Sequence, residues 1–168
     1  HIYDVDKKKS ELLVSKLQQK PEIVENAHLL SSNPLDLVVE AASQDAVNDN
    51  ALSILQNRKD LLIMSSGALL DESIFEIISD ACKEFKKTVY LPSGAISGID
   101  ALKSVKDELD SVVLTTTKHP NSLRGAPFFE HFKLNLDDIK EPSTIFEGTA
   151  SEAVRLFPKN VNVSALLS

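Results

Sequence analysis

The sequence predicts an α/β fold built on a doubly wound parallel sheet. Two observations lead to this prediction. Within the first 100 residues, five short apolar segments alternate with helical patterns, and three of those segments end in small, hydroxyl-bearing residues. Strands that alternate with helices form parallel sheets with right-handed crossovers, and ligands of such sheets bind at the carboxyl ends of the strands.

The elements of this first region follow from apolar periodicity and punctuation. Strands are predicted at 2–5, 24–30, 35–43, 60–66 and 88–91, and helices at 6–18, 44–55 and 71–85. Asp71 is placed as the N-cap of the last helix. Helix 44–55 is expected to bury Ala46, Val47, Ala51, Leu52 and Leu55, and helix 71–85 to bury Ile74, Ile77, Ile78, Ala81 and Phe85. The near-continuous apolarity of 35–43 predicts burial on both faces.

After Gly98 the pattern changes. A helix is predicted at 99–109, a strand with alternating side chains at 111–117, and a loop at 118–127. Residues 128–139 fit either a short helix or an insertion. A short strand at 144–148 precedes a capping box at 149–152, which opens a helix at 150–157, and another helix begins within 158–168.

The small residues after three predicted strands form the candidate ligand site. They are Ala41, Ala42 and Ser43, then Ser65, Ser66 and Gly67, and finally Ser93, Gly94 and Ala95. Because carboxyl ends of parallel strands share one edge, we expect these turns to line one crevice. Taken singly, each turn is equally an ordinary strand-to-helix connection whose small residues serve packing.

Composition limits the function classes. With 168 residues, 42% hydrophobic and 26% charged, the chain suits one soluble domain or one domain and part of a second. A net charge of -7 argues against a nucleic-acid partner. No apolar run is long enough for a membrane span, and the single Cys82 allows neither an internal disulfide nor a cysteine metal site. Cys82 is expected to be a buried small hydrophobe, and the compartment a reducing cytoplasm.

Six segments together resemble one enzyme family. They are 38–43 (VVEAAS), 65–68 (SSGA), 92–101 (PSGAISGIDA), 113–117 (VLTTT), 145–153 (IFEGTASEA) and 157–163 (FPKNVNV). In this order and spacing they resemble the L-aspartate dehydrogenase family. The resemblance implies that 1–100 is a Rossmann-like NAD(P)-binding domain without its first strand and Gly-rich turn. It also implies that 101–168 is the incomplete start of a mixed α+β catalytic domain.

The family resemblance also implies an activity and cofactor contacts. The activity is NAD(P)-dependent oxidative deamination of L-aspartate to iminoaspartate, or oxaloacetate plus ammonia, with a link to NAD biosynthesis. Asp4 matches the acidic residue that binds the adenosine ribose, which favours NAD over NADP, although Lys7–Lys9 would soften that preference. Ala95 matches a cofactor-contacting alanine and Asn162 a cofactor-contacting asparagine. The structural alternatives are Asp4 as a solvated strand-end aspartate or a helix cap, and Asn162 or Asn160 as a cap of the following helix.

Two departures from the family pattern shape the expectation. The five glycines, at 67, 94, 98, 125 and 148, form no Gly-rich phosphate turn. The histidine that the family uses in catalysis lies beyond Ser168, so we expect an internal fragment, inactive alone, with no catalytic residue in this chain. Of the histidines present, His28 is expected to pack within a strand, and His119 and His131 to lie in surface loops.

Two other function classes stay open at this point. One is a nucleotide-binding module without chemistry, and the other is a related reductase such as dihydrodipicolinate reductase or homoserine dehydrogenase. The segments 145–153 and 157–163 favour L-aspartate dehydrogenase. A dicarboxylate substrate needs a cationic partner, and Arg58, Arg124 and Arg155 are the only arginines, none of which the pattern places. A homodimer is expected from the type of protein.

Overall fold

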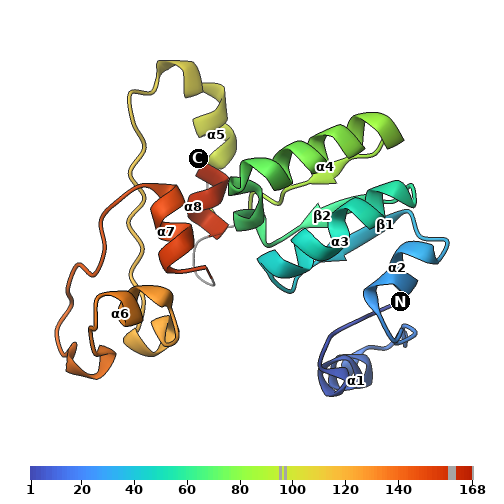
Figure 1. Cartoon of the computed structure of the whole chain (residues 1–168), viewed down its shortest axis with the longest axis horizontal. Coiled ribbons are helices and arrows are strands. Elements are labelled where there is room, and N and C mark those ends of the chain that lie inside the picture. Colours follow the sequence, from blue (N-terminus) through green and yellow to red (C-terminus); the bar gives the residue numbers. More distant parts are fainter. Residues whose placement is uncertain (95, 97, 159–161, 168) are drawn as a thin grey trace. The chain divides into compact units, whose positions relative to one another are not determined.

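The computed structural model describes residues 1–94, 96, 98–158 and 162–167. The chain divides into two compact units, His1–Leu91 and Pro92–Ser168, whose α-helices are labelled in Figure 1 together with β1 and β2. None of the helices within the described residues is long and apolar enough to cross a membrane.

The first unit is organised by a parallel sheet. Its described strands are β1 (Leu37–Glu40), β2 (Asp60–Ile63) and β3 (Val89–Tyr90), in the order β1-β2-β3. Helix α3 (Gln44–Gln56) connects β1 to β2, and the short η1 (Ser66–Leu70) with α4 (Glu72–Phe85) connects β2 to β3. This confirms the predicted parallel α/β arrangement.

Aliphatic side chains form the core of the first unit. Leu55 and Ile63 are fully buried, and α3 and α4 pack against each other over one face of the sheet (Figure 1). The opposite face is open in the described residues, where Val39 of β1 is 57% exposed. The prediction that 35–43 is buried on both faces is therefore wrong.

Local caps set the helix ends of this unit. Asp71 is the N-cap of α4, as predicted: its Oδ1 accepts hydrogen bonds from the hydroxyl and the backbone N–H of Ser73. The hydroxyl bond is the larger cause that lowers the pKa of the Asp71 carboxyl. Two predicted core positions are wrong, because Leu52 and Ile77 lie on the exposed sides of their helices. Ile54 is buried on α3 instead.

The first 33 residues differ in part from expectation. Helix α1 (Lys7–Lys16) forms where predicted, and Ile2 pairs with Ile23 in an isolated parallel bridge. The predicted strand 24–30 is wrong, because α2 (Ala27–Ser32) occupies most of it. The side chain of Asn26 accepts the N–H of Leu29 at 3.0 Å and starts that helix.

The second unit contains short helices in its described residues. They are α5 (Ile99–Ser104), η2 (Lys106–Glu108), η3 (Pro120–Leu123), α6 (Pro127–His131), η4 (Leu136–Asp138), α7 (Ala150–Leu156) and α8 (Asn162–Leu167). The predicted helix 99–109 thus breaks after Ser104. The predicted strands 111–117 and 144–148 are wrong: both segments are coil, and every residue of 111–117 is exposed. An alternating pattern makes a strand only where a partner strand supplies hydrogen bonds.

Aromatic rings form the core of the second unit. Phe128, Phe129, Phe132, Phe146 and Phe157 make one cluster, which we call the Phe cluster. Phe128 stacks on Phe157 with ring centroids 5.0 Å apart and is 6% exposed. The cluster therefore joins α6 to the end of α7.

The predicted capping box opens α7. The Thr149 hydroxyl accepts the N–H of Glu152, whose carboxylate accepts the N–H of Thr149 at 2.8 Å. The bond from that N–H is the main cause that lowers the pKa of Glu152. Gly148 lies against the same box. A Cβ there would stand 2.5 Å from Cζ of Phe146 and 2.8 Å from Oε2 of Glu152.

Candidate functional site

The first two predicted turns begin at the same edge of the sheet. Glu40, the last residue of β1, is opposite Ile63, the last residue of β2. The N–H of Met64 donates to the carbonyl of Glu40 at 3.0 Å and extends this pairing by one residue. The turn 41–43 and the turn 65–67 therefore start side by side at the carboxyl ends of their strands, where ligands of parallel sheets bind.

A buried carboxylate ties these two turns together. Glu40 is 9% exposed, and its Oε1 accepts the N–H of Ala42 at 2.7 Å and the hydroxyl of Ser65 at 2.8 Å. Its Oε2 accepts the N–H of Ser65 at 3.0 Å. Glu40 was not among the site residues predicted from the sequence. The available signal was a carboxylate at the end of an apolar strand, directly before two alanines.

The two turns differ in exposure. Ala41, Ala42 and Ser43 are exposed, whereas Ser65, Ser66 and Gly67 are buried in the turn that leads into η1. Ser43 is also the N-cap of α3, because its Oγ accepts the N–H of Ala46 at 3.2 Å. A ligand at this edge would thus meet the alanines and the first turn of α3, with 65–67 as support beneath.

Asp4 lies elsewhere in the first unit. It follows the bridge between Ile2 and Ile23, which is separate from the three-stranded sheet. Asp4 is half-buried, and its Oδ1 accepts the N–H of Asp6 at 2.8 Å. Asp6, rather than Asp4, is the N-cap of α1. The alternative of Asp4 as the helix cap is therefore wrong.

The remaining predicted contacts belong to the second unit. Ser93 is half-buried and Gly94 exposed, ahead of α5 along the chain. Asn162 is half-buried and is the first residue of α8. Ala95 and Asn160 lie outside the described residues. The structure thus brings together two of the three predicted turns, those of the first unit.

The histidines and the cysteine have structural surroundings. His119 and His131 are exposed, as predicted, but His131 is the last residue of α6 rather than part of a loop. Nδ1 of His119 accepts the N–H of Asn121 at 3.2 Å. His28 is exposed on α2, with its Nδ1 2.9 Å from the Ser32 hydroxyl, so its expected packing within a strand is wrong. Cys82 packs against the core of the first unit, and burial raises the pKa of its thiol. Within the described residues no three His, Cys, Asp or Glu side chains group as a metal site.

The three arginines have different local surroundings. Nη2 of Arg124 lies 2.8 Å from Oδ1 of Asp137 in an exposed ion pair. Arg58 lines an open pocket of about 530 Å³ at the end of α4, together with Lys86 and Lys87. Arg155 is exposed on α7.

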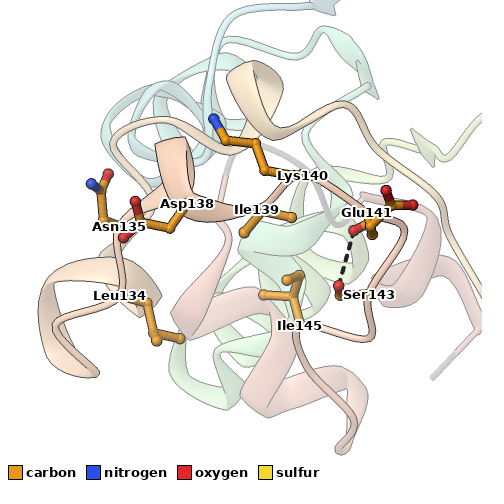
Figure 2. A pocket seen from close by; sticks show the side chains of 8 residues that line it. All are labelled: Leu134, Asn135, Asp138, Ile139, Lys140, Glu141, Ser143 and Ile145. Atoms are coloured by element: carbon orange, nitrogen blue, oxygen red, sulfur yellow. Dashed lines mark hydrogen bonds between the residues drawn. The ribbon is translucent and has the colours of Figure 1, made fainter.

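A pocket of about 410 Å³ in the second unit is shown in Figure 2. Its lining residues are Leu134, Asn135, Asp138, Ile139, Lys140, Glu141, Ser143 and Ile145. The Ser143 hydroxyl donates to the backbone carbonyl of Glu141 at 2.9 Å, which Figure 2 marks as a dashed line. The walls come from one stretch of mostly irregular chain and include none of the predicted cofactor residues. We therefore place the candidate cofactor site at the strand ends.

Comparison with protein families identifies the class of protein. Residues 1–92 match the NAD-binding domain family described as "Homoserine dehydrogenase, NAD binding domain". Residues 100–168 match the family described as "Aspartate dehydrogenase, C-terminal". Together with the parallel sheet and its small-residue strand ends, the first match defines a Rossmann-like NAD-binding domain.

Known relatives then identify the family. The L-aspartate dehydrogenase of Nitrosopumilus maritimus is 66% identical over 168 residues, covering 100% of this chain and 62% of that protein. That of Methanocella arvoryzae is 41% identical, covering 99% and 62%. The crystal structure of aspartate dehydrogenase from Thermotoga maritima superposes with a TM-score of 0.71 at 33% identity, covering 97% and 60%. This chain belongs to the L-aspartate dehydrogenase family and spans about three fifths of the length of these relatives.

Proposed function

We propose that the complete gene product containing this chain is an NAD(P)-dependent L-aspartate dehydrogenase. The observation that carries the proposal is the order of the two family matches, with an NAD-binding domain at 1–92 and an aspartate dehydrogenase C-terminal region at 100–168. The 66% identity to a named L-aspartate dehydrogenase along the whole chain supports the same substrate. We assign 1–100 to cofactor binding and 101–168 to the start of the catalytic domain.

The strand ends of the first unit fit a dinucleotide. Ala41 and Ala42 are exposed and carry only methyl groups, so a ligand can reach the backbone, and α3 offers N–H groups in its first turn. We assign Ala41, Ala42 and Ser43 to cofactor contact, with Ser65, Ser66 and Gly67 beneath them. Ser93, Gly94, Ala95 and Asn162 are assigned to the nicotinamide end by family resemblance.

The proposed reaction converts L-aspartate to iminoaspartate, which water hydrolyses to oxaloacetate and ammonia. NAD, when bound, would supply the acceptor for the hydride that leaves the Cα of aspartate, and a base would take the amine proton. We assign no base within the described residues, because His28, His119 and His131 are exposed and have only local contacts. We also propose that the protein is a cytoplasmic homodimer. Light scattering on the purified protein will test the oligomeric state.

The test of the activity is an assay of the complete gene product for aspartate-dependent NADH formation, with NADP, glutamate and homoserine as controls. We expect turnover with aspartate and none with homoserine. Turnover with homoserine alone would replace the substrate by that of homoserine dehydrogenase. Binding of NAD without turnover of any of these substrates would instead favour a non-catalytic nucleotide-binding module. The variant H119A is expected to keep its activity.

The site is tested by adding bulk at the strand end. Ala42→Leu places a larger side chain where the cofactor is proposed to lie, and we expect the KM for NAD to rise about tenfold, equivalent to about 1.4 kcal/mol. The matched control is Ser15→Leu, at a position on α1 that is also exposed. Equal KM values for NAD in the two variants would show that the cofactor does not bind at this edge.

Cofactor preference is tested at Asp4. A carboxylate beside the adenosine ribose repels the 2′-phosphate of NADP. We expect Asp4→Asn to raise the kcat/KM ratio of NADP over NAD about tenfold, again about 1.4 kcal/mol. Asp36→Asn serves as the control, because Asp36 is an exposed carboxylate of the same unit. An unchanged ratio in Asp4→Asn would exclude Asp4 from the ribose site.

A further inference from the structure

The buried carboxylate of Glu40 makes hydrogen bonds that are not part of the backbone pairing between strands. The sheet already joins β1 to β2 through backbone hydrogen bonds up to Ile63 and Met64. Beyond that point the chain turns away, and Glu40 holds Ala42 on one side and Ser65 on the other through hydrogen bonds of 2.7, 2.8 and 3.0 Å. The Glu40 side chain thus connects the two segments beyond the point where the backbone pairing of the strands ends.

A carboxylate suits this position because all three groups that it meets are donors. It accepts from the N–H of Ala42 and from both the N–H and the hydroxyl of Ser65. An amide of the same shape could accept at only one of its two ends, and its NH₂ group would face another donor. A buried polar network of this kind specifies one geometry, because an unsatisfied member is costly.

We infer that Glu40 is a positioning residue for the dinucleotide. Its carboxylate fixes the exposed turn 41–43 relative to the buried turn 65–67, so that the cofactor meets a preformed surface. This inference rests on the proposed function, because it takes the turn 41–43 as cofactor-binding. Glu40 acts through Ala42 and Ser65 and does not itself touch the cofactor.

The experiment compares two carboxylate-to-amide changes at opposite ends of the strands. Glu40→Gln weakens the tie at the carboxyl ends. Asp60→Asn is the matched control: Asp60 begins β2, its Oδ1 accepts the N–H of Thr88 at 3.0 Å, and it lies 3.5 Å from Nζ of Lys87. Both variants are made in the complete gene product, and NAD affinity, kinetic constants and thermal midpoints are measured.

We expect Glu40→Gln to weaken NAD binding about tenfold and to raise the KM for NAD with kcat retained, as for the loss of a charge-assisted hydrogen bond. Asp60→Asn should change NAD binding less than twofold at a similar thermal midpoint. Ser65→Ala, which removes only the hydroxyl donor, should show a smaller change than Glu40→Gln. The double variant Glu40→Gln/Ser65→Ala should lose less NAD affinity than the product of the two single fold-changes, because both residues belong to one hydrogen-bond network.

Three results would overturn the inference. The first is wild-type NAD affinity in Glu40→Gln, even with a lowered thermal midpoint, which would leave Glu40 with a purely structural role. The second is equal losses of affinity in Glu40→Gln and Asp60→Asn. If Glu40→Gln does not fold, unchanged NAD affinity in Ser65→Ala is decisive in its place. A wild-type protein that binds neither NAD nor NADP would instead remove the proposed function together with this inference.

Discussion

The two units of the chain are stabilised in different ways. The first has a parallel sheet and an aliphatic core centred on Leu55, Leu61 and Ile63. The second, in its described residues, has short helices, a capping box and the Phe cluster. In the first unit each strand pairs with the next strand along the chain, one helix away. The regular alternation of strands and helices is what allowed its organisation to be predicted from local patterns.

The largest expected effect is a loss of stability in the second unit. Phe128→Ala removes the ring at the centre of the Phe cluster, where the side chain is 6% exposed, and should cost about 4 kcal/mol of unfolding free energy. Hydrogen exchange should show the loss of protection in α6 and α7, with α3 and α4 unchanged. Phe132→Ala is the matched control, because Phe132 is 53% exposed. Equal losses in both variants would contradict a cluster centred on Phe128.

The next effect breaks the first unit. Leu55→Ala opens a cavity at a fully buried position of α3 and should cost about 3 kcal/mol, with the loss of protection confined to the first unit. Leu52→Ala on the same helix is the control and should cost much less, since Leu52 is 38% exposed. Chemical denaturation gives both values. A larger cost for Leu52 would mean that α3 faces the other way.

A smaller effect tests the local cap of the second unit. Thr149→Ala removes the hydroxyl that accepts the N–H of Glu152 and should cost about 1 kcal/mol. Thr144→Ala, at an exposed coil position, is the control and should be neutral. Denaturation of the two variants under the same conditions makes the comparison. No difference between them would show that the box contributes nothing to α7.

The smallest effect is the pH dependence of the caps in both units. The pKa values of Asp71 and Glu152 are lowered by hydrogen bonds from Ser73 and Thr149. A lowered pKa in the folded state adds stability above the ordinary carboxyl pKa, near ~4, and that stability is lost as the pH falls through the folded-state value. Thermal midpoints of wild type, Asp71→Asn and Glu152→Gln should therefore differ at pH 7 and converge toward pH 3. Parallel curves would contradict these shifts.

Sequence patterns predicted what depends on nearby residues. Helix α3 was predicted from its apolar spacing. Helices α4 and α7 were predicted with their caps as well, because Asp71 and Thr149 act on backbone groups two or three residues away. The strand at 24–30 was predicted wrongly because the cap at Asn26 was not recognised. The predictions of strands at 111–117 and 144–148 were wrong, because a strand needs a partner strand for its hydrogen bonds and a local pattern does not show whether one is present.

The candidate site shows the same limit. The small residues after β1 and β2 were recognised from the sequence, and the structure brings those two turns together. Glu40 was not recognised, because its role depends on Ser65, which is 25 positions further along the chain. The local sequence shows a carboxylate at the end of an apolar strand, but it does not show that Ser65 will supply two donors to it.

A substitution at Gly148 would disturb two neighbouring side chains as well as the turn itself. Any other amino acid there would put its first carbon into space that the Phe146 ring and the Glu152 carboxylate already fill. Either the ring must shift or the carboxylate must leave the N–H of Thr149. A single added methyl group at this turn therefore forces the chain to give up some of its aromatic packing or the start of a helix, although the position is exposed and hydropathy alone marks it as free to vary.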